Sequence, residues 1–98
     1  MDKEKLLKII NTYGVNNQQR KLAEEVFELQ ESIIIEEDRK KHLKLNCFCI
    51  DAIKEEIADV MVMLEQFKLY YGISSEDITK IFWEKVDRQI GRIKDSDK

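Results

Sequence analysis

The sequence has no proline and only three glycines among its 98 residues, so the residues that interrupt helices are almost missing. Charged residues make up 38% and hydrophobic residues 43%, in near-regular helical spacing. This combination favours an all-α fold and disfavours a sheet protein or a disordered tail. The length predicts one domain over residues 1–98, small enough for self-association to add stability.

Cysteine is also scarce. Cys47 and Cys49 are too few and too close together for a disulfide framework. Together with His42 they could offer three ligands to zinc, but the spacing matches no common zinc site and no fourth ligand is apparent. We therefore interpret both cysteines as small apolar residues in a reducing compartment.

Long hydrophobic runs are missing as well, since none reaches the roughly 18 residues that a membrane span needs. The segment from Met1 to Glu4 does not resemble the start of a signal peptide. We therefore expect a cytoplasmic protein without a membrane partner. The formal net charge of -3 gives no general attraction for a nucleic-acid polymer, so any polyanion has to meet a local basic patch.

Four helices are predicted from the spacing of apolar residues and from capping signals. The first runs from Asp2 to the pair Tyr13-Gly14, and the second begins at a cap on Asn16 or Asn17 and ends near Arg39. A connector is expected over about residues 36–50, where the apolar pattern breaks. The third helix is expected from Asp51 to Gly72, and a fourth follows a capping box that starts at Ser74 and includes Asp77.

A short acidic pattern occurs twice in the chain. Residues 22–29 read Leu-Ala-Glu-Glu-Val-Phe-Glu-Leu, and residues 53–60 read Ile-Lys-Glu-Glu-Ile-Ala-Asp-Val. Each helical residue advances about 100°, so two carboxylates of each copy lie to one side of its apolar stripe. The stripes consist of Leu22, Val26, Leu29 and Ile33, and of Ile53, Ile57, Val60 and Leu64. If they pack together, four carboxylates converge at one edge of the shared core: Glu25, Glu28, Glu56 and Asp59.

Four like charges beside a dry core repel one another, so the pattern predicts a positive partner at this edge. Mg²⁺ prefers hard oxygen ligands, and it can bridge to nucleotide phosphates and lower the pKa of an attacking water. Glutamates on an amphipathic helix are often merely solvated, but two copies at matching offsets favour a shared site. Chemistry alone does not separate nucleotide hydrolysis from other metal-binding bundles.

A basic stripe lies on the last helix, where Lys85, Arg88 and Arg92 fall within about 60° of one another. Such cations suit the β and γ phosphates of a triphosphate. A second group of candidates follows the second helix, namely Arg39, Lys40, Lys41 and Lys44. For both groups the alternative interpretation is ordinary solvation of an exposed surface.

At the acidic residues the sequence resembles the MazG-like all-α nucleoside triphosphate pyrophosphohydrolases. Their E-E-x-x-E motif reads Glu24-Glu25-Val26-Phe27-Glu28 here, and their E-x-x-D motif reads Glu56-Ile57-Ala58-Asp59. An aromatic-glycine pair and a glutamine usually precede the first motif, as Tyr13-Gly14 and Gln18-Gln19 do. The resemblance extends over about residues 13–92.

This resemblance implies a four-helix bundle completed by oligomerisation and a housecleaning enzyme of the nucleotide pool. Such an enzyme hydrolyses a nucleoside triphosphate between the α and β phosphates, releasing a monophosphate and pyrophosphate. The implied cofactor is Mg²⁺, or Mn²⁺ in its place. By resemblance Glu25, Glu28, Glu56 and Asp59 are metal ligands, Glu24 orients the water, and Lys85 and Arg88 match basic positions. Trp83 stands where many relatives have asparagine.

Apolar residues away from the main stripes, for example Ile34 and Val62, predict a homodimer or homotetramer, because one layer of four helices does not bury them all. Two alternative functions remain at this point. One is a non-catalytic helical interaction module whose acidic edge is only solvated. The other is a module that binds nucleotide without hydrolysing it. Metal binding distinguishes the interaction module from the enzyme.

Overall fold

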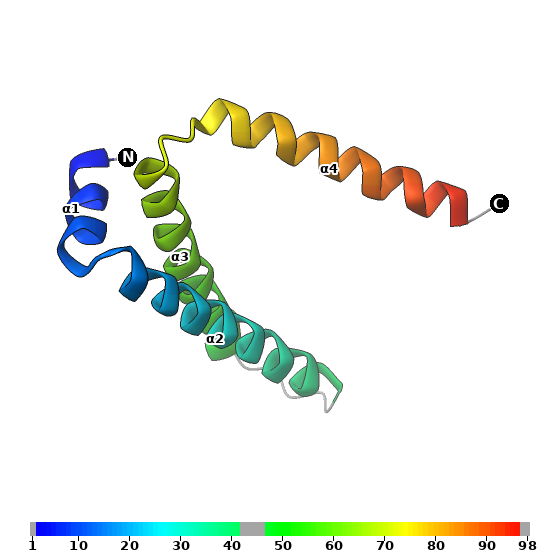
Figure 1. The fold of residues 1–98 in the computed structure, drawn as a ribbon. Helices are drawn as coiled ribbons and strands as arrows, with labels where there is room; N and C mark the ends of the chain where they lie inside the picture. The colour runs from blue at the N-terminus through cyan, green and yellow to red at the C-terminus, as the bar shows by residue number, and fades with distance from the viewer. Residues whose placement is uncertain (1, 42–46, 97–98) are drawn as a thin grey trace.

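The computed structural model describes residues 2–41 and 47–96, without the side chains of residues 47–49. Over these ranges its secondary structure consists of helices joined by short turns, without a strand, which confirms the predicted all-α class. The helices are α1 (Lys3–Tyr13), α2 (Val15–Lys41), α3 (Cys47–Tyr70) and α4 (Ser75–Ser96), as Figure 1 shows. None of the four is both long and apolar enough to cross a membrane. The side chains considered for zinc, His42, Cys47 and Cys49, lie outside the described residues.

One glycine forms the whole junction between α1 and α2. Gly14 has a φ of 87°, which L side chains rarely adopt, and its N–H donates to the Ile10 carbonyl at 2.8 Å to end α1. Its own carbonyl accepts from the Gln18 N–H at 3.0 Å, which starts α2. The predicted cap on Asn16 or Asn17 is therefore wrong. Asn17 is already helical, and its amide donates to the Tyr13 carbonyl at 2.8 Å.

The connector between α2 and α3 is shorter than predicted. Helix α2 continues to Lys41, because its last turn carries three basic residues that favour a helix C-terminus and Lys40 pairs with Glu37 at 3.7 Å. Helix α3 begins at Cys47 and not at Asp51, since no glycine or proline interrupts residues 47–50. Asp51 instead pairs with Lys54 at 3.8 Å.

The predicted boundaries between α3 and α4 are confirmed. Gly72, with a φ of 66°, ends α3, and the Ile73 N–H donates back to the Lys68 carbonyl at 2.8 Å. The hydroxyl oxygen of Ser74 accepts from the Asp77 N–H at 3.1 Å, which caps α4. A short turn over residues 71–74 therefore separates α3 from α4, which runs in a new direction.

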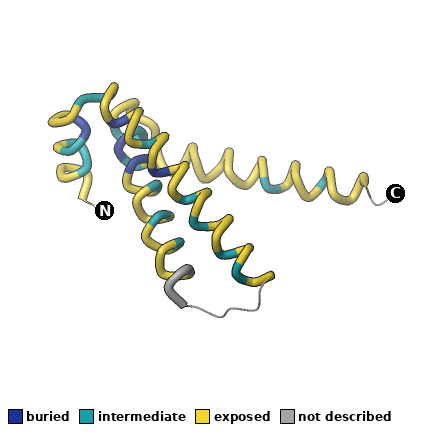
Figure 2. The backbone as a smooth tube through the Cα atoms, turned by 90° about the horizontal axis from the view of Figure 1, so that it is seen from below, coloured by how far each residue is buried: buried dark blue, intermediate teal, exposed yellow. Residues whose placement is uncertain are grey.

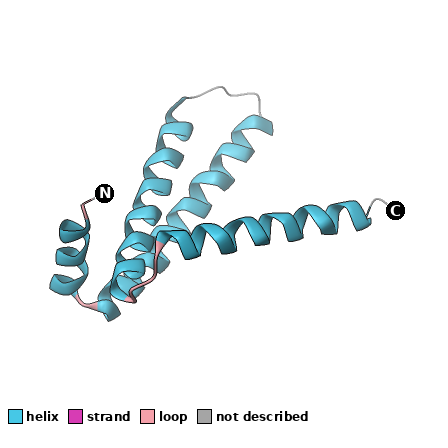
Figure 3. Ribbon diagram, turned by 90° about the horizontal axis from the view of Figure 1, so that it is seen from above, coloured by secondary structure: helices cyan, strands magenta, loops and turns pink. Residues whose placement is uncertain are grey.

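Three of the helices pack together. Helices α2 and α3 run antiparallel as a hairpin, and α1 packs mainly on α3 (Figure 3). Within the described residues α4 makes no comparable contact, and it projects away from the hairpin like an arm. Four helices are thus present, but they do not form a closed bundle within one chain.

The contact between α2 and α3 follows alternating steps of three and four residues, as in an antiparallel coiled coil. On α2 it contains Gln18, Leu22, Glu25 and Leu29, and on α3 it contains Ile53, Glu56, Val60 and Met63. The predicted stripes are therefore only partly correct, since their members Val26, Ile33, Ile57 and Leu64 are exposed. This rotation places Glu25 and Glu56 inside the seam.

One broad side of the hairpin is apolar and uncovered. Val26 and Ile33 lie on the flank of α2 opposite Glu28, and Ile57 and Leu64 lie on the flank of α3 opposite Asp59. Among the residues whose side chains are described, the buried apolar ones are Ile10 and Met63. Exposed residues dominate all of α4 (Figure 2). Its exposed apolar side chains are Ile78, Ile81, Phe82, Trp83, Ile90 and Ile93.

We predict that Gly14→Ala lowers the free energy of unfolding by about 1–3 kcal/mol, because the backbone conformation is strained for alanine although the space is open. Gly91→Ala is the matched control, since Gly91 also has open space around its missing side chain but lies inside α4. There alanine adds helix propensity, so stability should not fall. Urea denaturation followed by circular dichroism measures the free energy of unfolding of both variants. An equal decrease in the two variants would contradict the role of Gly14.

Candidate metal centre

The hairpin brings three of the predicted metal ligands together. Glu25 of α2 and Glu56 and Asp59 of α3 each offer a carboxylate oxygen, and these oxygens all lie within 4.8 Å of one another. Glu56 and Asp59 are three residues apart, so they share one face of α3. Glu25 comes from the other side of the seam. The cluster therefore depends on the packing of the two helices and not on one helix alone.

Burial decreases across the cluster. The Glu25 side chain is 8% exposed, Glu56 is half-buried and Asp59 is exposed. Three side-chain oxygens in the described part of the chain are buried without a hydrogen-bond partner, and two of them belong to the cluster, Glu25 Oε2 and Glu56 Oε2. A buried carboxylate oxygen without a partner is costly, and a cation would satisfy both atoms. The site is thus dry at one end and open to solvent at the other.

Lys21 is the cation nearest to Glu25 and was missed by the sequence reasoning. Its Nζ lies 3.0 Å from Glu25 Oε1 and 3.8 Å from Glu24 Oε2. The hydrogen bond to Glu25, followed by the attraction of that carboxylate, raises the pKa of Lys21. The sequence already contained this information, because Lys21 and Glu25 are four residues apart and such residues are neighbours on a helix. Lys21 occupies one oxygen of Glu25 and leaves Oε2 for another partner.

Glu28 lies beside the cluster and acts on Glu56. The pKa of Glu56 is raised, first by burial, then by repulsion from Glu28, Asp59 and Glu25, and also by a hydrogen bond with Glu28. The other three predicted ligands therefore all act on Glu56, although Glu28 does not supply an oxygen to the compact group. Burial and the neighbouring negative charges thus disfavour the charged form of Glu56, and a bound cation would act in the opposite direction.

The residue proposed to orient water, Glu24, lies next to the cluster. Its side chain is 65% exposed, and its described ion pair is the longer contact to Lys21. Glu24 points away from the seam that holds Glu25, since adjacent helical residues differ by about 100°. It is therefore close to the cluster but outside the group of three converging oxygens.

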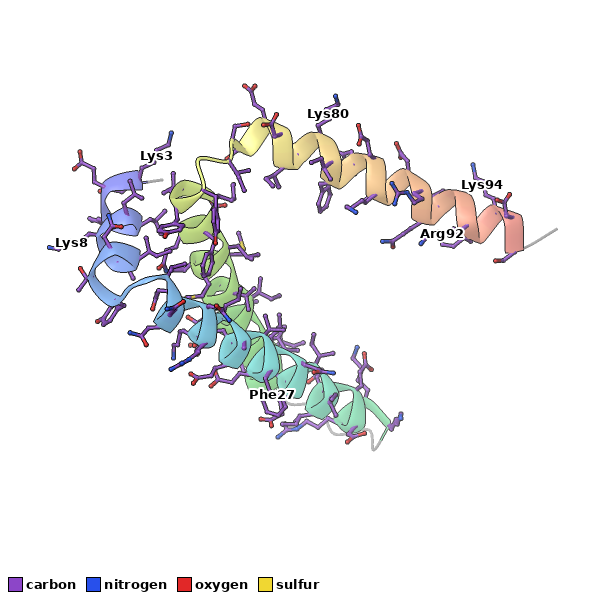
Figure 4. The ribbon with its side chains drawn as sticks, viewed as in Figure 1. Lys3, Lys8, Phe27, Lys80, Arg92 and Lys94 are labelled. Atoms are coloured by element: carbon purple, nitrogen blue, oxygen red, sulfur yellow. The ribbon has the colours of Figure 1, made fainter. Side chains whose placement is uncertain are left out.

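The basic stripe of Lys85, Arg88 and Arg92 does not reach the cluster within one chain. All three side chains are exposed on α4, and α4 does not pack on α2 or α3 in the described structure. Figure 4 labels Arg92 on α4, well separated from Phe27 on α2. Among the second group of candidates, Arg39 is half-buried, Lys40 pairs with Glu37, and Lys44 lies outside the described residues.

The donor set fits a hard divalent cation. Carboxylate oxygens from two helices, open to solvent on one side, suit Mg²⁺ or Mn²⁺, which keep water ligands when few carboxylates bind them. The described cluster has neither sulfur nor imidazole, so it does not resemble a zinc site. Glu25, Glu56 and Asp59 are the residues that would hold the ion, with Glu28 within reach of Glu56.

We predict that Glu56→Gln stabilises the metal-free protein at neutral pH. Below the ordinary glutamate pKa, Glu56 is protonated in both states. As the pH rises from there through the raised folded-state pKa, the unfolded chain loses its proton first, and the free energy of unfolding falls. Removing the charge removes that loss, so wild type and variant should converge only in acid.

The control is Glu55→Gln, which removes the same charge from a neighbouring exposed position on α3. Its stability should follow that of the wild type at every pH. Saturating magnesium should stabilise the wild type more than Glu56→Gln, as thermal denaturation can measure. If stability depended on pH in the same way in both variants, ionisation of Glu56 would be no more costly to the folded protein than ionisation of Glu55.

Comparisons with models of protein families, with curated proteins and with solved structures find no match to this chain. The geometry of the carboxylates, their burial and the neighbouring cation are therefore the basis for the function discussed below.

Proposed function

We propose that this chain is a magnesium-dependent hydrolase of nucleoside triphosphates. In this proposal it cleaves between the α and β phosphates, releases a nucleoside monophosphate and pyrophosphate, and serves as a housecleaning enzyme of the nucleotide pool. The observation that carries the proposal is the convergence of Glu25, Glu56 and Asp59, two of which hold buried oxygens without partners. These are residues of the two acidic patterns that resemble the MazG-like motifs.

The four carboxylates of the two patterns hold the metal in this proposal. Glu25, Glu56 and Asp59 provide the converging oxygens, and Glu28 completes the set from beside Glu56. When bound, the ion neutralises phosphate charge and makes a water molecule more acidic. Mn²⁺ would serve as well as Mg²⁺, because both accept carboxylate and water oxygens.

Two neighbouring side chains have separate roles. Glu24 is exposed and outside the converging group, so it is free to orient the water that attacks the α phosphorus. Lys21 neutralises Glu25 while no cation is bound. A metal ion would take over that task, and the Lys21 ammonium group would then be available to a phosphate oxygen.

We also propose that the active form is a homodimer or homotetramer in which copies exchange their α4 arms. Each chain has an uncovered apolar side on the hairpin and an uncovered apolar face on α4. Reciprocal exchange covers both surfaces without another component. Since Lys85, Arg88 and Arg92 lie far from their own cluster, they would serve the phosphates at the site of a second copy.

The alternative function is a helical interaction module without catalysis. It is favoured by the apolar face of α4, where even Trp83 is 57% exposed, because such a surface is typical of an interface with another protein. The module does not require the buried carboxylates of the seam to bind a metal. Metal binding therefore separates the two functions.

We predict that Glu25→Gln reduces pyrophosphate release by at least about 100-fold, since loss of a metal-binding or charge-stabilising group costs about 3 kcal/mol or more in the transition state. Calorimetry should also show weaker magnesium binding. Glu31→Gln, an exposed change on the same helix, is the control and should retain both properties. Unchanged magnesium binding in Glu25→Gln would refute the metal centre.

Arm exchange predicts complementation between two inactive variants. In a mixture of Glu25→Gln and Arg88→Ala chains, half of the dimers are mixed and each contains one intact site, so about a quarter of the wild-type rate should return. The control mixture combines Glu25→Gln with Asp59→Asn, which both alter the hairpin and should restore nothing. Sedimentation at micromolar concentration should show no monomer, and a monomeric mass would contradict the exchange.

A further inference from the structure

A groove lies beside the metal centre, where α1 meets α2 and α3. Its volume is about 570 Å³, which is in the range of ligand pockets in proteins. Apolar side chains form its walls, among them Ile9 and Tyr13 of α1 and Met63 of α3. The buried residues of the described chain gather in the same region, where the three helices are held most firmly (Figure 2).

Two buried glutamines contribute polar groups to this groove. Gln18 of α2 is 7% exposed and Gln66 of α3 is 1% exposed. The Gln18 Nε2 donates to Gln66 Oε1 at 2.8 Å, and the Gln66 Nε2 donates to the Val62 carbonyl at 3.3 Å. These bonds hold both amides in fixed orientations. The Gln18 Nε2 also donates to Met63 Sδ at 3.9 Å, so both N–H donors are used, and among the described contacts the carbonyl oxygen Oε1 is the group of this amide with capacity for a further partner.

The groove adjoins the metal centre at Lys21. Lys21 and Glu24 both contribute to the groove, and Lys21 contacts Glu25 of the carboxylate cluster at 3.0 Å. A ligand with phosphates at the cluster would therefore extend past Lys21 towards Gln18. Arg20 adds another positive charge to the groove, which suits an anionic ligand.

We propose that this groove binds the nucleobase of the nucleotide, and this inference rests on the proposed function of the neighbouring metal centre. A nucleobase has flat apolar faces and hydrogen-bonding groups only along its edge. Proteins bind such rings between aromatic or apolar side chains and read the edge with polar groups. Tyr13 and Met63 provide the apolar contacts here, and the fixed Gln18 amide provides the polar group.

Tyr13→Ala tests the groove, because Tyr13 is 61% exposed and its removal should not impair folding. The probes are Mg²⁺ complexes of inorganic tripolyphosphate and of nucleoside triphosphates with a methylene group between the α and β phosphorus atoms, which prevents cleavage. Tyr13→Ala should weaken binding of the nucleotide analogues roughly tenfold, as expected for one stacking contact, and leave tripolyphosphate binding unchanged. Tyr71→Ala removes an equally exposed tyrosine outside the groove and should alter neither.

The proposal is overturned if wild type binds the analogues no more tightly than tripolyphosphate, or if Tyr13→Ala binds them as wild type does. Failure of tripolyphosphate to bind would instead count against the proposed hydrolase. In that case titration with the four common nucleosides, which carry no phosphate and need no metal, still tests whether the groove binds a nucleobase. Chemical-shift changes confined to the amides around Tyr13, Gln18 and Gln66 support it, and the absence of changes there overturns it.

Discussion

The contact between α2 and α3 is the constraint on which the rest of the structure depends. Its alternating steps of three and four residues place Glu25 and Glu56 in positions that apolar side chains usually occupy. Charged groups in such positions weaken a helical hairpin unless they are neutralised. Lys21 pairs with one oxygen of Glu25, and burial together with the neighbouring carboxylates raises the pKa of Glu56. The hairpin thus keeps mutually repelling carboxylates close together, and a divalent cation would relieve this repulsion. Functional sites often retain such unfavourable interactions at the expense of stability.

The same contact explains why the groove lies beside the cluster. One seam residue, Gln18, comes two helical turns before Glu25, so the amide and the carboxylate line up along one side of α2. Helix α1 closes the groove over that end, because Gly14 turns the chain back without a linker. The firmly packed groove and the acidic cluster therefore lie next to each other along the contact of α2 with α3.

Much of the fold followed from local signals. Asp2 accepts from two N–H groups at the start of α1, and Gly72 and Ser74 mark the next boundaries, as their chemistry predicts. The rotation of the seam was not predicted, because Leu22, Val26 and Glu25 all lie close to the same face and only packing selects among them. Of the site, the meeting of Glu25, Glu56 and Asp59 was predicted. Gln66 was missed since its role arises from contacts 48 residues apart in sequence. The projection of α4 was missed because the spacing of apolar residues predicts an apolar face but not the helix on which that face packs.

If copies exchange α4 as proposed, this projecting helix would link the survival of the chain to its abundance. A helix of 22 residues gains most of its stability from tertiary contacts, and α4 has few of them in the described structure, among them the bond from Lys68 of α3 to Ser75 at 3.0 Å. A lone copy would therefore present the exposed aromatic and aliphatic side chains of α4 to chaperones and proteases. Association would hide these groups and slow degradation. Cells that make too little of the chain for copies to associate would then degrade it. The surface that joins copies would in this way also determine which copies persist.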